Sequence, residues 1–496
     1  MSVATPQTSR RAQLDKAMVG GLAWSAASRW LSQLFRWAAT IVTARLLLPS
    51  DYGIVGMATV LIGLLQNVAE FGFGAAIVQQ RELSRTTVRE IGGTALMIAV
   101  GLALLTTAVS PLAVRFFSEP ALRLVIPVMS LRFIIDAFAT VPRSTLARDL
   151  KFQRLSILEG VESMVMAGVT VGLAWYTRSY WAFIASNLVS GVVFAAMAQA
   201  SDPHAPLMPR SFAGIRSQIA FGRDVVLARL AWYTYSNADF AIVGRVLSKS
   251  ALGYYSLAWN LASVPAEKFS GLVLRVAPSI LSAARAHPGE MRRYYLLLVQ
   301  GVAMITFPLA VGLALVSEGL VVGVLGAKWE PAVNPMRLLS LFFAVRSIAA
   351  LAPVVMISRG EPYVDRNYST VFALLLPGMF VVGARWGITG VAAVWLIAYP
   401  LIFSILSQRW VFRALEIEAG AFVKMLWPAG SSALAMCVPV LLVDRYLPPV
   451  VPQLVRLALM VATGGLAYVG TLRLFHRASF DGAVRLVRNR GISPAA

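Results

Sequence analysis

Two arginines in the first long apolar stretch of the chain carry side chains suited to binding an anion. Arg29 and Arg36 lie within the segment "SAASRWLSQLFRWAATIVTARLL". In an α-helix a spacing of seven residues returns to nearly the same face, about 10 Å further along the axis. A guanidinium at the bilayer centre costs about 2.5–3.5 kcal/mol unless it faces protein, water or an anion. Because arginine makes bidentate contacts with phosphate, the pair predicts an anion-binding stripe.

Further cations fall within apolar stretches at Arg132, Arg229, Lys268, Arg275 and Arg346. Arg132 is followed four residues later by Asp136, which favours a structural pair on one helix. Arg275 lies near the end of its stretch, where a snorkelling side chain is the alternative to a binding role. Arg346 has no acid in its own stretch and could pair across helices. The sequence predicts a cationic substrate site formed by Arg29, Arg36, Arg229, Lys268 and Arg275.

Carboxylates inside apolar stretches suggest a second kind of chemistry. Glu70, Asp239 and Glu267 are the candidates, because intramembrane acids in transporters carry protons or bind sodium. The alternative for each is charge pairing with the intramembrane arginines. A metal site is not predicted, since Cys437 is the one cysteine and the three histidines are far apart in the sequence.

The elements that position these residues are apolar helices. The 496-residue chain is 58% hydrophobic and 14% charged, with a mean hydropathy of +0.71, which indicates a polytopic membrane protein. Stretches long enough to cross a hydrocarbon core must be helical, because lipid leaves no partner for unpaired backbone groups. Fourteen spans are predicted, near residues 18–45, 52–78, 91–114, 124–142, 155–176, 180–199, 216–244, 252–281, 295–317, 334–357, 368–384, 387–408, 424–443 and 455–472.

The distribution of Lys and Arg predicts the orientation of the chain. Loops on the side of the N-terminus hold 26 of the 44 Lys and Arg residues and loops on the other side hold 11. The positive-inside rule then places both termini in the cytoplasm, with residues 1–17 and 473–496 as cytoplasmic tails. No cleavage site follows a short apolar core, so the first span is expected to be a retained anchor. Nucleic-acid binding is not predicted, because no basic soluble domain exists to carry it.

Enzymatic chemistry finds no support in the sequence. The glycine-rich phosphate-binding loop, the zinc-protease motif and the serine-hydrolase motif are all missing. The loops, all under about 25 residues, leave no room for a soluble catalytic domain. The protein is therefore predicted not to be an enzyme and to need no cofactor.

An internal repeat predicts two halves. Residues 42–61, "VTARLLLPSDYGIVGMATVL", match residues 242–261, "IVGRVLSKSALGYYSLAWNL", at six positions with an offset of 200. Arg29 and Arg229 share that offset. Parallel repeats of this kind predict two pseudo-symmetric six-helix bundles, 18–200 and 216–410, joined by a cytoplasmic linker at 201–215. Two extra helices follow within 424–472.

Three segments carry a family resemblance: "TARLLLPSDYGIVGMATVLIGLLQNVAEFGFGAAIVQQRELS" (43–84), "YYSLAWNLASVPAEKFSGLVLRVAPSILSAARAHPGEMRRYYL" (254–296) and "LGAKWEPAVNPMRLLSL" (325–341). They resemble the polysaccharide-transporter branch of the MOP flippase superfamily, the Wzx or WzxC type. The resemblance implies two six-helix bundles around a central cavity, alternating access, and a bacterial inner-membrane location. The implied substrate is an undecaprenyl-pyrophosphate-linked oligosaccharide of an exopolysaccharide, capsule or O-antigen, moved from the cytoplasmic to the periplasmic leaflet.

The resemblance also bears on partners and on alternatives. Membrane lipids, a polysaccharide polymerase and a chain-length regulator are the implied partners. Related flippases place cavity arginines on their first and eighth helices, which Arg29, Arg36, Lys268 and Arg275 match by helix but not by motif. The alternatives are a cation-coupled multidrug exporter, a flippase for the peptidoglycan precursor lipid II, and a membrane glycosyltransferase or ligase. The exporter reading favours acids in the cavity, and the transferase reading a long extracytoplasmic loop.

Overall fold

All regular structure in the described part of the chain is helical. The computed structural model describes residues 33, 35–69, 77, 84–207, 230, 232–361, 363–448 and 450–481. Within these residues nine helical stretches are long and apolar enough to cross a membrane. Each of the fourteen predicted spans coincides at least in part with a described helix. The predicted all-α polytopic fold is confirmed. The tails at 1–17 and 482–496 lie outside the described residues.

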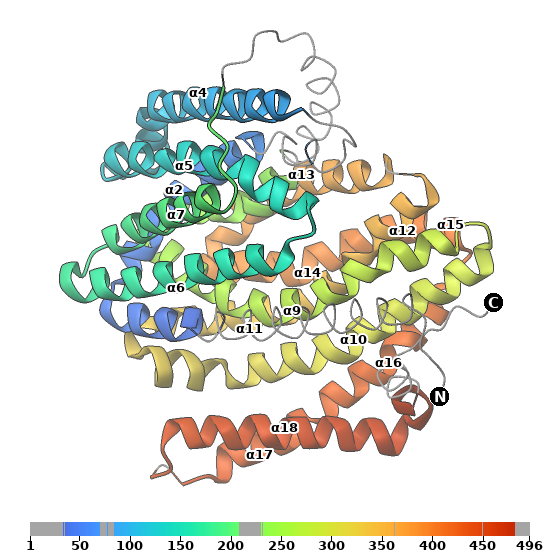
Figure 1. The fold of residues 1–496 in the computed structure, drawn as a ribbon. Helices are drawn as coiled ribbons and strands as arrows, with labels where there is room; N and C mark the ends of the chain where they lie inside the picture. Colours follow the sequence, from blue (N-terminus) through green and yellow to red (C-terminus); the bar gives the residue numbers. More distant parts are fainter. Residues whose placement is uncertain are drawn as a thin grey trace, which may run out of the picture. The chain divides into compact units, whose positions relative to one another are not determined.

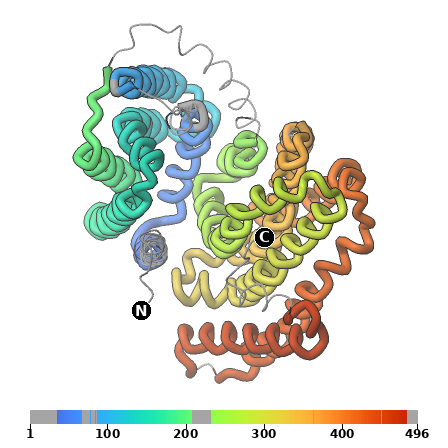
Figure 2. Tube along the Cα trace, turned by 45° about the vertical axis from the view of Figure 1, so that its right-hand side comes forward, coloured from blue at the N-terminus to red at the C-terminus, as the bar shows by residue number. Residues whose placement is uncertain are grey.

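The chain divides into two compact units, Met1–Tyr233 and Thr234–Ala496. The first unit holds a helical segment at 35–46 and five long helices: α2 (Pro49–Ala69), α4 (Arg85–Phe117), α5 (Leu122–Arg148), α6 (Phe152–Thr177) and α7 (Trp181–Ser201). Helix α5 contacts α2, α4 and α7, and α6 packs along α7. Figure 2 shows α4 to α7 close to end-on. This packing makes α5 the central helix among the described contacts.

The second unit contains more helices and several breaks. A helical segment at 232–242 crosses the boundary between the units and is followed by a π-helical turn, η1 (Val243–Leu247). Then come α9 (Lys249–Ala283), α10 (Pro288–Glu318), α11 (Val333–Ala349), α12 (Leu351–Arg359), α13 (Tyr363–Gly383), α14 (Gly387–Ser407), α15 (Arg413–Leu415), α16 (Ala419–Ala435), α17 (Cys437–Tyr446) and α18 (Gln453–Phe475). Helix α11 packs against α9, α10 and α14. Helices α17 and α18 lie side by side, as Figure 1 shows.

Several helices begin earlier or end later than hydropathy predicts. Helix α4 begins at Arg85, because the Ser84 hydroxyl accepts a hydrogen bond of 3.0 Å from the Thr87 amide. Ser248 caps α9 in the same way through the Ala251 amide, also at 3.0 Å. Such caps satisfy backbone groups at a helix end, so a polar turn remains helical. Hydropathy detects only the apolar part of each helix.

Two predicted spans are each built from two helices. The span predicted at 334–357 breaks at Ala350 between α11 and α12, and the span at 424–443 breaks at Met436 between α16 and α17. A proline follows each break by three residues, at Pro353 and Pro439. Proline has no amide hydrogen to donate and crowds the preceding turn, which accounts for an interruption at these points.

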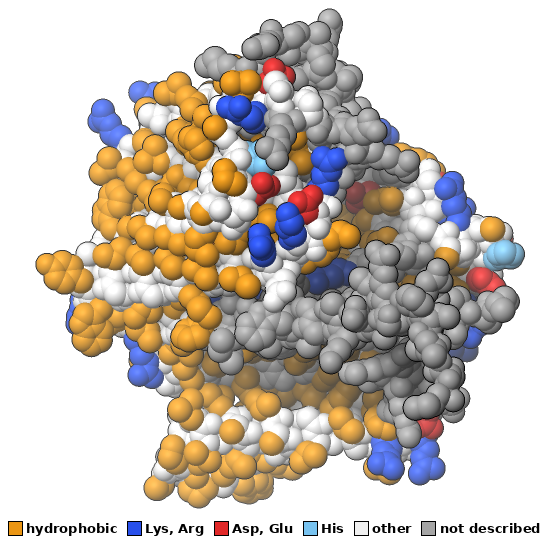
Figure 3. Space-filling model, in the orientation of Figure 1, with side chains coloured by type: hydrophobic (Ala, Val, Ile, Leu, Met, Phe, Trp, Pro, Cys, Tyr) orange, Lys and Arg blue, Asp and Glu red, His pale blue; other side chains and the backbone are white. Residues whose placement is uncertain are grey.

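The exterior of the helices is largely apolar. Large hydrophobic side chains are exposed on many of them, including Leu104 on α4, Trp175 on α6, Leu374 on α13 and Leu466 on α18. Figure 3 shows hydrophobic side chains spread over the part of the first unit formed by α5, α6 and α7. Because a lipid-facing surface is as apolar as a protein core, this pattern fits helices immersed in a bilayer.

Candidate functional site

The predicted cationic site is described in part. Arg29, Arg229 and the candidate coupling residue Glu70 lie outside the described residues. Arg36 lies on the helical segment 35–46, where its side chain is exposed. Its Nη2 donates a hydrogen bond of 2.9 Å to Oε1 of Gln33, one turn earlier. An amide carries no net charge, so this contact orients the guanidinium, and no ion pair of Arg36 with a described carboxylate is seen.

Besides Asp239, the second unit contains three residues of the predicted sites, and all three lie on α9. Glu267, Lys268 and Arg275 are all exposed. Lys268 and Arg275 are seven residues apart, so they share a helix face in the same way as Arg29 and Arg36 are predicted to do. Glu267 interacts electrostatically with Lys268 and with Arg346 of α11. Arg346 was not part of the predicted site.

Asp239 has an unusual environment for a carboxylate. It is fully buried on the segment 232–242. Its Oδ2 accepts hydrogen bonds from the Tyr255 hydroxyl of α9, at 2.7 Å, and from the Trp395 indole N–H of α14, at 2.8 Å. Its Oδ1 has no hydrogen-bond partner among the described residues. A buried carboxylate with only neutral donors is expensive unless it takes up a proton or a cation, which suits the ion-coupling interpretation.

Arg132 has a structural role in the first unit. Its Nε lies 2.8 Å from Asp136 Oδ1 and its Nη2 lies 2.8 Å from Glu162 Oε1. Its Nη1 donates a hydrogen bond of 2.6 Å to the Asn187 carbonyl. The predicted pairing of Arg132 with Asp136 is confirmed. One guanidinium therefore joins α5, α6 and α7, and all three of its nitrogens are engaged.

Replacing Arg132 by Gln is expected to destabilise the protein by about 3 kcal/mol, because the Asp136 and Glu162 carboxylates would lose their shared cation. Thermal unfolding of the purified protein in detergent measures the effect. Lys151→Gln is the matched control: it breaks the exposed pair of Lys151 with Asp149, for which less than about 1 kcal/mol is expected. Equal melting temperatures for the two variants would contradict a structural role for Arg132.

The position that the predicted site omitted is Arg346 of α11. Its guanidinium carbon lies 5.7 Å from the ring centre of Trp259, 6.0 Å from that of Phe342 and 5.6 Å from that of Phe343. In the described part of the chain no carboxylate lies within ion-pair distance of it, so the expected pairing across helices is not seen there. The sequence held one signal: "FFAVR" places two phenylalanines one helical turn before the arginine.

An aromatic cluster connects Arg346 with the neighbours of Asp239. The Trp395 ring centre lies 4.8 Å from that of Phe342 and 5.5 Å from that of Trp259. Trp395 also donates its indole hydrogen bond to Asp239. Asp239 and Arg346 therefore lie beside one set of packed rings.

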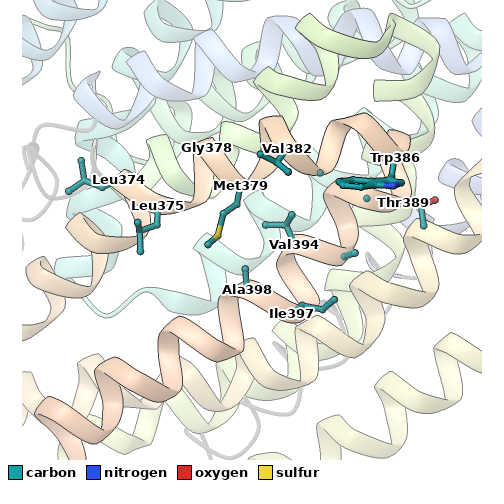
Figure 4. A pocket seen from close by; sticks show the side chains of 13 residues that line it. Leu374, Leu375, Gly378, Met379, Val382, Trp386, Thr389, Val394, Ile397 and Ala398 are labelled. Carbon is teal, nitrogen blue, oxygen red and sulfur yellow. The ribbon is translucent and has the colours of Figure 1, made fainter.

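A groove between α13 and α14 has a different character. It has a volume of about 730 Å³ and is lined by Leu374, Leu375, Gly378, Met379, Val382, Gly383, Trp386, Thr389, Gly390, Ala393, Val394, Ile397 and Ala398. Figure 4 shows Met379 of α13 pointing toward α14, near Val394 and Ala398. None of the lining residues carries a charge, so the groove suits hydrocarbon and offers no cation to a phosphate.

The fold and the intramembrane charges together define a polytopic α-helical membrane protein with charged groups inside its spans. The chain belongs to a family described as polysaccharide biosynthesis protein, which matches residues 42–334. This match covers more than half of the chain and confirms the family resemblance predicted from the sequence.

Two relatives and one solved structure extend this result. The chain is 23% identical to the teichuronic acid biosynthesis protein TuaB of Bacillus subtilis (strain 168), over 82% of this chain and 84% of the relative. It is 24% identical to the lipopolysaccharide biosynthesis protein WzxC of Escherichia coli (strain K12), over 79% and 80%. The structure of the lipid II flippase MurJ in its inward closed conformation matches with a TM-score of 0.74 and 12% identity, covering 92% of this chain and 99% of that one. That likeness concerns the fold alone.

Proposed function

We propose that the protein is a flippase that moves undecaprenyl-pyrophosphate-linked oligosaccharide repeat units from the cytoplasmic to the periplasmic leaflet of the bacterial inner membrane. The observation that carries this proposal is the family match over residues 42–334, with relatives named for the biosynthesis of surface glycans. The protein acts as a transporter and not as an enzyme. The lipid II alternative has the support of fold likeness only.

The charges inside the spans support a phosphate-bearing substrate. A pyrophosphate headgroup loses its hydration when it enters the membrane, and cations along its path lower that barrier. Arg36 and Arg346 provide guanidinium groups with no carboxylate at ion-pair distance among the described residues, and Lys268 and Arg275 add charge on α9. Arg29 and Arg229 complete the proposed cationic path. The proposed mechanism is alternating access through a cationic cavity, coupled to ion movement at Asp239.

Deletion of the gene tests the function. The deletion strain is expected to lose its surface glycan while continuing to make the lipid-linked repeat unit, which should accumulate on the cytoplasmic face. Surface glycan is measured on intact cells, and the lipid-linked unit is measured in membrane extracts. A strain that lacked the lipid-linked unit altogether would instead support the transferase alternative. The proposed polymerase and chain-length regulator would act after this step.

The orientation of the chain is part of the proposal, with both termini in the cytoplasm. Reporter fusions after Arg123, Arg178 and Lys328 are expected to be periplasmic, and those after Lys151 and Arg292 cytoplasmic. The excess of Lys and Arg on the side of the N-terminus is the physical reason. A paired alkaline phosphatase and fluorescent-protein reporter gives the readout. A cytoplasmic signal after Lys328 would contradict the proposed two-bundle topology.

A further inference from the structure

We infer that residues 202–207 form a strap that is fixed to the first unit, and that Gly93 of α4 and Gln199 of α7 are the positioning residues that hold it there. The connection to the second unit then starts at α4, after Leu207, and not at the end of α7. The consequence for transport rests on the proposed function. In alternating access, movement between the two units takes place beyond the strap, which keeps its place on α4, α5 and α7.

The strap begins where α7 ends, and it is bound there to α5. The Asp202 amide donates a hydrogen bond of 3.0 Å to the Ala198 carbonyl, which closes the last turn of α7. The Asp202 carboxylate accepts a hydrogen bond from the Thr145 hydroxyl of α5. The His204 ring Nδ1 lies 3.0 Å from the Asp202 carbonyl oxygen. The first residues of the strap are therefore in contact with two helices of the first unit.

The side-chain amide of Gln199 holds the next part of the strap. Its Oε1 accepts a hydrogen bond of 3.0 Å from the His204 amide, and its Nε2 donates one of 3.2 Å to the His204 carbonyl. The same Nε2 donates a hydrogen bond of 2.8 Å to the Phe138 carbonyl of α5. An amide offers two hydrogens and a carbonyl oxygen, so a leucine of similar size at this position would lose all three contacts.

The strap then crosses to α4, as Figures 1 and 2 show for the segment that follows α7. Arg89 Nε donates a hydrogen bond of 3.0 Å to the Ala205 carbonyl, and the Leu207 amide donates one of 2.9 Å to the Arg89 carbonyl. Pro203 and Pro206 fix two backbone φ angles of the strap. A short segment with anchors on three helices has little conformational freedom left, which places the start of any movement after Leu207.

Two glycines of α4 allow this close approach. A side-chain carbon at Gly93 would collide with the Leu207 carbonyl, and one at Gly92 would lie 3.9 Å from Pro206 Cα. Gly93 is buried. Glycine is unfavourable in the interior of a helix, and here its missing side chain lets the backbone of the strap lie directly on α4. Gly93 is therefore the position at which a substitution would lift the strap from its helix.

The first experiment measures whether the strap is docked. Leu207→Cys is combined with Cys437→Ala, which removes the native thiol, and labelling by a membrane-impermeant maleimide is followed in inside-out membrane vesicles. Adding Gly93→Leu is expected to raise the labelling rate about fivefold or more, because the new side chain drives the Leu207 carbonyl away from α4. Gly101→Leu is the matched control on the same helix: its first side-chain carbon would meet no atom within 4 Å, so the rate should stay unchanged.

Surface glycan in the complemented deletion strain gives the transport readout. Gly93→Leu is expected to lower export at least threefold at equal membrane protein, because a released strap shifts the point about which the units move. Gly101→Leu should export like wild type. Should Gly93→Leu fail to reach the membrane, Gln199→Leu is expected to change labelling and export in the same directions. An unchanged labelling rate would overturn the strap, and raised labelling with wild-type export would overturn its role in transport.

A cross-link tests whether the strap keeps its place during transport. Gly92→Cys with Pro206→Cys places two thiols at a separation suited to a disulfide, because the Gly92 side-chain carbon would lie 3.9 Å from Pro206 Cα. In a strain whose cytoplasm is oxidising, because its thiol reductases are deleted, the disulfide is expected to form while export stays within about twofold of that in a reducing strain. Gly92→Cys alone controls for the oxidising strain.

Loss of export in the cross-linked protein alone would show that the strap must leave α4, and failure of the pair to cross-link would contradict docking. Neither the labelling nor the formation of the disulfide depends on the transported substrate. A deletion strain with normal surface glycan would therefore contradict the proposed function while leaving the docking of the strap intact.

Discussion

Replacing Arg29 and Arg36 together by Gln is expected to lower surface glycan at least tenfold, while the amount of protein in the membrane stays at the wild-type level. Two cations are removed from the membrane interior, so the cost of insertion falls rather than rises. Export falls because the pyrophosphate loses two guanidinium groups on its path. Arg36 donates only to the neutral amide of Gln33, so no described ion pair is broken by its replacement.

Complementation of the deletion strain provides the measurement, with surface glycan normalised to membrane protein. Lys at both positions is expected to restore export in part, because an ammonium supplies charge without the planar fork. Arg337→Gln is the control, because Arg337 pairs with Glu318 at 2.9 Å, and export by that variant should equal wild type. Wild-type export from the double Gln variant would exclude these arginines from the path. Loss of the protein from the membrane would identify them as structural partners of acids.

Asp239→Asn is expected to reduce export at least tenfold without lowering the melting temperature. Asparagine keeps the shape of the side chain, and its carbonyl oxygen can accept the hydrogen bonds from Tyr255 and Trp395. It cannot take up a proton or balance a bound cation. The carboxylate is fully buried among neutral donors, so removal of its charge should leave the melting temperature unchanged or raise it.

Export in the complemented deletion strain and thermal unfolding of the purified variant test this expectation together. Glu318→Gln is the control, because it neutralises an exposed carboxylate of the same unit that pairs with Arg337. Normal export from Asp239→Asn would assign Asp239 a packing role. A large fall in melting temperature would show that the ionised carboxylate stabilises the fold.

The predicted domain boundaries and the six-helix grouping remain predictions. The boundary between the two compact units falls after Tyr233, within the predicted seventh span. The described part of that linker, residues 201–207, is tied to the first unit, where the Leu207 amide donates a hydrogen bond of 2.9 Å to the Arg89 carbonyl. The polar composition of residues 201–215 predicts a linker, but it does not indicate which helix the linker packs against.

Partners that lie on one helix were readable from spacing, and partners on different helices were not. Arg132 and Asp136 are four residues apart, so their pairing follows from helix geometry, whereas Glu162 arrives from α6. The same holds at Arg346, where Phe342 and Phe343 precede it on α11 but Trp259 comes from α9. Asp239 was predicted as a candidate from the sequence. Its contact with Trp395 could not be predicted, because Trp395 lies 156 residues further along the chain.

The sequence by itself determined the class of protein, the positions of the helices and the presence of charges inside them. The reason is that lipid forces every spanning segment to satisfy its own backbone hydrogen bonds, so local hydropathy is sufficient. Only the tertiary structure decided which charges are compensated: Arg132 is held by two carboxylates, while Arg346 stands among aromatic rings. Packing between helices decides this, because it sets which side chains from distant segments come within a few ångströms of each other.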